Sequence, residues 1–412
     1  MRPGARGAAQ AGYNASVTDQ ATTYHRWQFW LGVSRLATTV ALLVVLLVTG
    51  AALTLRQWAE AAGHPRWLQV AELLVILSAA LRAATAPLTW LAGYHLPRRF
   101  GLLHQPLARW VLDHLKAVAL SGALALVAAE AVYALLSLTA WWWLWGAVVF
   151  FVGSALLATV VPVLIVPLFY RLAPLTDEAL RERLLALASR AGVPIVGAWV
   201  VDESRKSRTA NAALTGLGRT RRILLFDTLV ERFGADEVES VLAHELAHHV
   251  HGDLRRALIV QAALTLVTFW VADRFLRFGS TRFGLEGPAD PAGLPLFGLI
   301  LVAVGLLTLP LANGYSRWVE RRADDFALSL TRNPEAFIGA MERLAELNLA
   351  ERRPHPVKEF FLFSHPSIER RIARARRVAT EEGAGALPSG EREGRGASIG
   401  GVAESLTEGG ER

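Results

Sequence analysis

The stretch DEVESVLAHELAHHVHGD, which runs from Asp236 to Asp253, decides how the rest of the sequence is interpreted. Asp236 and Glu239 have the spacing of a capping box, and apolar residues follow at helical intervals, so the stretch predicts a helix. His244 and His248 are separated by one helical turn and would project from one face of it. Two imidazole rings placed in this way can bind one metal ion.

Glu245 follows the first of these histidines and completes the pattern His-Glu-x-x-His. On a helix, this carboxylate would stand beside the metal and could deprotonate a water molecule. A chance match is on the order of 1% for a chain of this histidine content, but unrelated helices also contain the pattern. A polar helix face is therefore the plain alternative.

A third protein ligand is expected in the run SRWVERRADDFA, residues 316–327. Glu320 and Asp324 are one helical turn apart and would share a face. Glu320 can then coordinate Zn²⁺ as the third ligand, while Asp324 accepts the outer N–H of a ligand histidine. The alternative is a charged face with Glu–Arg pairs. We expect one zinc ion per chain, held by His244, His248 and Glu320.

The composition indicates a multi-pass α-helical membrane protein. Of 412 residues, 53% are hydrophobic and only 19% are charged, and the absence of cysteine excludes thiolate ligands and disulfides. Apolar stretches long enough to cross a bilayer, which needs about 20 residues, occur six times, at Leu36 to Leu55, Trp67 to Leu91, Ala117 to Leu138, Trp142 to Tyr170, Ala257 to Leu276 and Leu294 to Leu311. Four spans thus lie in 36–170 and two in 257–311.

Positive charge predicts the orientation. Arginines precede the first span in the segment 1–35, and Arg98, Arg99 and Lys116 lie in the loop near 92–116, which places both segments in the cytoplasm. Six spans then put the polar segments 171–256 and 312–379 on the same side of a plasma or inner membrane. Nucleic acid is not an expected partner, because no basic stripe interleaved with aromatic residues is visible.

Those two polar segments are expected to form one α+β lobe. Thr176 to Ala191 reads as an amphipathic helix, and three short strands are predicted to pair as a small antiparallel sheet, at Ile195 to Val201, Thr209 to Leu214 and Ile223 to Phe226. The segment 380–412 is rich in Gly, Glu, Ser and Arg and is expected to be a disordered tail.

Together with the motifs above, several further stretches resemble the M48 family of peptidases, and the type 1 CAAX prenyl protease more than the HtpX type. They are RRFG at 98–101, PLF at 167–169, SRTANA at 207–212, ILLFDTL at 223–229 and SHP at 364–366. The sequence departs from that pattern in its short first loop, in six spans where the eukaryotic enzymes have seven, and in its glycine-rich tail.

The resemblance implies a gluzincin-type zinc endopeptidase lobe that caps a helix-lined cavity in the membrane. Glu72, Arg82 and Glu130 lie within spans, where water in such a cavity, buried pairs or snorkelling would explain them. The implied substrate is a peptide or protein, membrane-associated or lipidated and cleaved near its C-terminus. An HtpX-like protease of membrane or misfolded proteins is the alternative. Outside the enzyme class, a membrane transporter or an inactive scaffold competes.

The resemblance also implies roles for residues beyond the metal ligands. His365 would face the tetrahedral intermediate, and Arg371 would hold a nearby carboxylate or the loop. The alternative is that His365 only caps the next helix. Sites of this type bind extended peptide along a sheet edge, here through Asn211, Ala212 and Leu214, although Asn211 could simply flank a turn.

Overall fold

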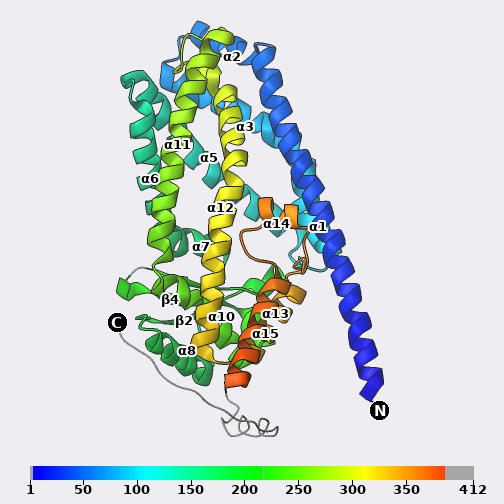
Figure 1. Ribbon diagram of the computed structural model, residues 1–412. Helices are drawn as coiled ribbons and strands as arrows, with labels where there is room; N and C mark the ends of the chain where they lie inside the picture. Colours follow the sequence, from blue (N-terminus) through cyan, green and yellow to red (C-terminus); the bar gives the residue numbers. More distant parts are fainter. Residues whose placement is uncertain (1–2, 217, 386–412) are drawn as a thin grey trace, which may run out of the picture.

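The computed structural model describes residues 3–216 and 218–385 (Figure 1). Long helices form an upper layer, and the four-stranded sheet with its short helices forms a lobe below it. Helix α15 runs from Ile368 to Gly385, so the expected tail begins as helix. The remainder of that segment, 386–412, lies outside the described residues.

Six helices build the upper layer. Five helical segments in the described residues are long and apolar enough to cross a membrane, and a sixth apolar helix, Trp142–Ala158, is shorter. These helices form a closed ring, in which each helix packs against the next one in the chain and the last one packs against α1. In ring order the helices are α1 (Pro3–Val48), α3 (Arg66–Trp90), α5 (Leu107–Leu138), α6 (Trp142–Val160), α11 (Asp253–Arg282) and α12 (Leu294–Thr331).

The first span begins and ends earlier than expected. Its apolar helical segment is Asp19–Val48, whereas the sequence predicted Leu36 to Leu55. Gly50 has a left-handed φ of 71°, which ends α1, and the apolar residues after it form the separate helix α2 (Ala51–Ala61). Composition alone cannot show this break, because apolar residues continue across it.

Two other spans end in π-helical turns close to prolines. Helix α3 continues as η1 (Leu91–His95) and α4 (Leu96–Arg99), and α6 continues as η2 (Val161–Ile165) and α7 (Val166–Phe169). Pro97 and Pro167 provide no backbone N–H donor, and π turns relieve the interrupted hydrogen-bond ladder.

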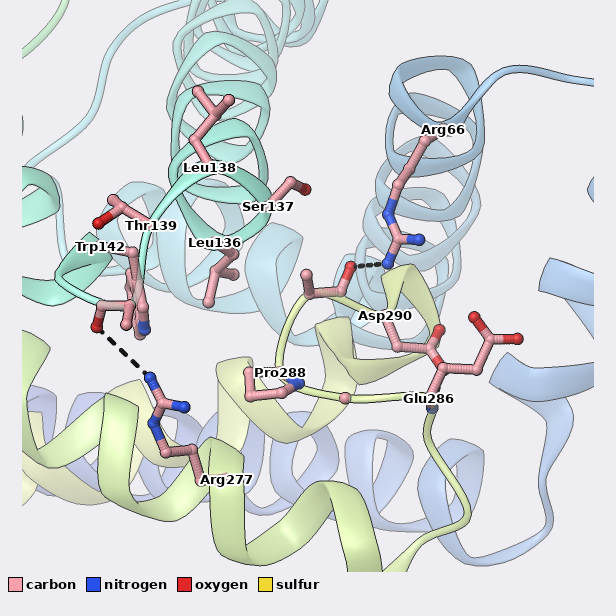
Figure 2. A pocket seen from close by; sticks show the side chains of 13 residues that line it. Arg66, Leu136, Ser137, Leu138, Thr139, Trp142, Arg277, Glu286, Pro288 and Asp290 are labelled. Atoms are coloured by element: carbon pink, nitrogen blue, oxygen red, sulfur yellow. Dashed lines mark hydrogen bonds between the residues drawn. The ribbon is translucent and has the colours of Figure 1, made fainter.

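A loop with paired charges closes the end of the bundle opposite the lobe. Arg66 donates to the carbonyl of Ala289, and Arg277 donates to the carbonyl of Ala140 at 3.4 Å, across a cavity of about 610 Å³ (Figure 2). Beneath this loop, Arg56 is buried and donates to Asp290 at 2.7 Å. The turn η5 (Pro291–Gly293) then leads into α12.

The lobe contains a mixed sheet in the order β1-β2-β4-β3. The expectation of an antiparallel sheet is wrong for its centre, because β2 and β4 pair in parallel and only the outer pairs are antiparallel. Strand β3 begins at Ala212 rather than Thr209, and the three-residue β1, which contains Pro174, was not predicted. The strands are β1 (Leu172–Pro174), β2 (Gly197–Val201), β3 (Ala212–Thr215) and β4 (Arg222–Phe226).

Helices cover this sheet and bury one continuous apolar core. Leu184 of α8, Ile223 of β4, Leu242 of α10 and Phe337 of α13 are fully buried in it. The lobe's helices and short 3-10 turns are α8 (Glu178–Arg190), η3 (Glu203–Arg205), η4 (Gly218–Thr220), α9 (Asp227–Arg232), α10 (Ala235–Val250), α13 (Pro334–Leu347) and α15. Helix α14 (Pro356–Leu362) instead lies against α12. The core packs α10 firmly against the sheet, which fixes the face that carries the two histidines.

The N-terminus of α10 is capped differently from the prediction. The helix begins one residue before Asp236, and Glu237 accepts the backbone N–H of Gly234 at 2.8 Å. Asp236 and Glu239 instead form ion pairs with Arg183 of α8. The helix itself was predicted correctly, because either carboxylate satisfies the requirement for a negative group in its first turn.

Candidate metal centre

Helix α10 presents two imidazole rings on its side facing α12. The ring centroids of His244 and His248 are 5.1 Å apart and their planes are nearly perpendicular, at 89°. Only 8% of His244 is exposed, and His248 is half-buried. This arrangement leaves one ring nitrogen of each residue free to face a shared point.

Helix α12 brings Glu320 to that point. One oxygen, Oε2, lies 3.1 Å from Nε2 of His244, and the other, Oε1, lies 3.7 Å from Nε2 of His248. One ligand atom from each of the three residues falls within 4.8 Å of the others. Oε2 is buried and has no hydrogen-bond partner among the described residues. A bound cation would satisfy this oxygen, so the residues fit a metal ion.

Asp324 lies one turn further along α12 and contacts His244 on the ring nitrogen that faces away from Glu320. Its Oδ1 is 2.9 Å from Nδ1 of His244. Burial lowers the pKa of His244, but the close carboxylates of Asp324 and Glu320 together outweigh burial and raise this pKa to about 9. The surrounding carboxylates therefore favour positive charge at the ring. This is the contact predicted from the Glu320–Asp324 spacing.

Arg371 of α15 lies on the other side of Asp324. It donates through Nη2 to Oδ1 at 2.5 Å and through Nε to Oδ2 at 2.9 Å, and both residues are buried. A two-point contact of this kind fixes the plane of the carboxylate. The carboxylate that Arg371 was expected to hold is thus Asp324.

Asp253 holds the second histidine, and this residue was not singled out from the sequence. Its Oδ2 is 3.1 Å from Nδ1 of His248, and it is 5% exposed. Gly252 has a left-handed φ of 64°, so the chain turns between α10 and α11 and returns the carboxylate toward the metal ligands. Its position, at the end of the quoted stretch, was the available signal.

Glu245 lies next to the ligand cluster and is half-buried. Burial raises the pKa of this carboxyl, the two histidines lower it, and the charge of Glu320 raises it further, with a net increase. A carboxylate with a raised pKa is a better proton acceptor.

His365 reaches the same cluster from the loop before α15. Its Nε2 is 3.3 Å from Oε1 of Glu320, and its Nδ1 is 2.9 Å from the hydroxyl of Ser364. Glu359, and not His365, accepts the N–H of Ser367 beside the helix start, at 3.2 Å. The position of His365 therefore favours the site over a capping role.

The predicted substrate-binding residues lie at the edge of the sheet. Strand β3 is the last strand in the sheet order and packs against α10. Asn211 precedes it, and its side-chain oxygen accepts the N–H of Ala212 at 2.9 Å. Leu214 continues the strand opposite Ile223. The side-chain oxygen of Asn211 thus accepts the backbone N–H of the next residue, as in a turn-flanking asparagine.

Fold and site together define a membrane protein with a metallopeptidase lobe. Residues 174–379 match Peptidase family M48, and residues 8–171 match the group described as CAAX prenyl protease N-terminal, five membrane helices.

Two curated relatives and one solved structure agree with these matches. The chain is 30% identical over 365 residues to Uncharacterized metalloprotease YhfN of Bacillus subtilis, covering 87% of this chain and 85% of that protein. It is 29% identical over 321 residues to CAAX prenyl protease 1 of Saccharomyces cerevisiae, covering 73% and 70%. The crystal structure of S. mikatae Ste24p has the same fold, with a TM-score of 0.79 at 24% identity over 87% of this chain and 89% of that one.

The chain belongs to peptidase family M48. It is an integral membrane metalloendopeptidase, as the resemblance predicted, and the expected fold class of a helical membrane bundle with an α+β peptidase lobe is confirmed.

The contact between Asp253 and His248 generates the first prediction. Asp253→Asn should weaken metal binding about 10- to 100-fold, because the neutral amide accepts a weaker hydrogen bond from the ring and no longer increases its basicity. Metal affinity of the purified protein, measured by competition with a chelator, tests this. Asp236→Asn changes an exposed carboxylate on the same lobe and serves as the matched control. Equal metal affinities of the two variants would show that Asp253 does not contribute to metal binding.

Proposed function

We propose that the chain hydrolyses peptide bonds with one zinc ion held by His244, His248 and Glu320. The carrying observation is that a buried carboxylate faces two imidazoles whose outer nitrogens contact Asp324 and Asp253. Two histidines and one glutamate are the ligands of many catalytic zinc sites, which keep one position open. When bound, zinc lowers the pKa of water and polarises a carbonyl oxygen.

Glu245 acts as the general base. It takes a proton from the attacking water and passes that proton to the nitrogen of the leaving amine. Its place beside His244 on α10 and the raised pKa of its carboxyl support this role.

His365 stabilises the charge that develops on the carbonyl oxygen when water adds. It donates an N–H to that oxygen, an interaction that strengthens as the charge forms. Two contacts support this role: the ring lies 3.3 Å from Glu320, and its other nitrogen is engaged by Ser364. Arg371 acts indirectly by fixing Asp324, and so the orientation of His244.

The substrate is an extended segment of a peptide or protein that is lipidated or otherwise associated with the membrane. The similarity to CAAX prenyl protease 1 supports cleavage near a C-terminus. The outer edge of β3 would pair with the substrate backbone through the N–H of Ala212 and the strand up to Leu214. The side chain of Asn211 would release that N–H on binding.

The active site faces the cytoplasm of a cell whose plasma or inner membrane contains the bundle. The loop that follows Arg98 and Arg99 donates backbone N–H groups to the carbonyl of Lys206 in the lobe, and Lys116 donates to the carbonyl of Leu168, just before β1. These basic residues thus lie at the lobe end of the bundle, which supports this orientation by the positive-inside rule.

Glu245→Gln tests the proposed function. The glutamine cannot accept the proton, so turnover should fall by about 10²- to 10⁴-fold, while zinc content stays at one per chain. His248→Ala, the matched comparison, should lose both zinc and turnover. Elemental analysis and hydrolysis of a labelled peptide by the protein in detergent give the two readouts. Turnover of the Glu245 variant within a few-fold of wild type would exclude this residue as the base.

His365→Ala tests the proposed donor. We expect kcat to fall about 10²- to 10³-fold, with KM, zinc content and melting temperature nearly unchanged. His355→Ala is the control, because that exposed histidine contacts only the start of α14 through the N–H of Val357 among the contacts described. If the His365 variant instead loses melting temperature and keeps its kcat, the residue is structural.

Orientation can be tested with two single cysteines, since the chain has none of its own. Ser189→Cys places a thiol on the exposed surface of the lobe. Thr281→Cys places one at an exposed position on α11, at the end of the bundle remote from the lobe. An impermeant thiol reagent added to intact cells should label only the Thr281 variant. The reverse pattern would place the active site outside the cell.

A further inference from the structure

We propose that a cavity between α1, α3 and α5 binds the phosphate headgroup of an anionic phospholipid. The cavity has a volume of about 890 Å³. Its lining includes Arg35 of α1, Arg82 of α3, and Trp110 with His114 of α5. This proposal does not depend on the proposed peptidase activity.

The first argument is charge. Two guanidinium groups line the cavity, and none of its described lining residues carries a carboxylate. Arg82 donates to the neutral hydroxyl of Ser121 at 3.2 Å. A guanidinium group within a membrane span is costly unless it is hydrated or meets an anion. The ligand that complements this lining is therefore negatively charged.

The second argument is depth. At 1.5 Å per residue, Arg35 and Arg82 lie about 20 Å and about 24 Å from the helix ends remote from the lobe, inside a hydrocarbon layer of about 30 Å. Trp90 and Trp110 lie about 36 Å and about 42 Å from those ends. Tryptophans mark the membrane interface, so the cavity extends from the lower hydrocarbon layer to the level of the lobe-side headgroups. The flexible arginine side chains can extend toward that level.

The third argument comes from a contrast within the protein. The cavity in Figure 2 also contains two arginines, but Arg66 and Arg277 donate to backbone carbonyls there. Arg277 also pairs with the buried Asp273 at 2.9 Å, and both Glu286 and Asp290 line that cavity. The protein itself balances these charges, whereas no carboxylate is among the described residues that line the cavity between α1, α3 and α5.

The composition of the cavity favours a lipid over the C-terminal carboxylate of a peptide. All of its described lining residues belong to α1, α3 and α5, whereas the metal-ligand cluster lies on α10 and α12. Leu36, Leu115 and Val118 add apolar surface for an acyl chain. The rings of Trp110 and His114 stack with their centroids 5.2 Å apart and form a flat side of the cavity. Basic pockets between transmembrane helices on the cytoplasmic side are typical sites for anionic headgroups.

Native mass spectrometry of the full chain, released from nanodiscs that contain equal amounts of dioleoyl phosphatidylglycerol and dioleoyl phosphatidylcholine, tests the proposal. The wild-type protein should retain phosphatidylglycerol in preference to phosphatidylcholine. In the double variant Arg35→Gln/Arg82→Gln, the ratio of retained phosphatidylglycerol to phosphatidylcholine should fall about 10- to 30-fold. In Arg35→Lys/Arg82→Lys, this ratio should stay close to that of wild type. Arg66→Gln/Arg277→Gln, at the opposite end, is the control. Melting temperature and metal content verify the fold of each variant.

Three results would overturn the proposal. An unchanged preference in the glutamine double variant would show that the cavity does not bind the lipid, and an equal loss in the control pair would show a general effect of charge. Displacement of phosphatidylglycerol by millimolar inorganic phosphate would assign the cavity to a soluble anion.

Discussion

The carboxylate of Asp324 joins three segments that are far apart in the sequence. It belongs to α12, contacts His244 of α10 at 2.9 Å, and accepts two hydrogen bonds from Arg371 of α15. Removing one partner from a buried charged group of this kind costs about 3–5 kcal/mol. This one side chain therefore couples the orientation of His244 to the packing of the helix that carries Glu320 and of α15.

Much of the candidate metal centre could be predicted from the sequence because its spacing is set by helix geometry. Residues four apart on a helix must share a face, and this alone pairs His244 with His248 and Glu320 with Asp324. Asp253 escaped prediction because its approach to His248 depends on the left-handed turn at Gly252, and acidic residues are common in the first turn of any helix. The backbone-directed oxygen of Asn211 is equally a local detail that spacing does not encode.

The fold divides in the same way. Hydropathy located the membrane helices, since a bilayer demands long apolar stretches, but it misplaced the first one because Gly50 interrupts an apolar run. The parallel pairing of β2 with β4 could not be predicted from strand patterns, because β3 comes between them in the chain and yet pairs on the far side of β4. Both errors concern where the chain turns, and both leave the peptidase lobe and its position below the bundle intact.

Helix α12 extends from Leu294 to Thr331, with Pro310 inside it, so one helix of 38 residues carries both a membrane span and the Glu320 carboxylate. A transmembrane helix tilts when the bilayer is thinner than its apolar length. This helix is about 57 Å long, and its lower part packs closely along α10. A change of tilt would therefore move Glu320 and the histidines of α10 together. The membrane span and the Glu320 carboxylate thus share one helix, so the depth at which the bilayer holds that span also sets the depth of the candidate metal-ligand cluster.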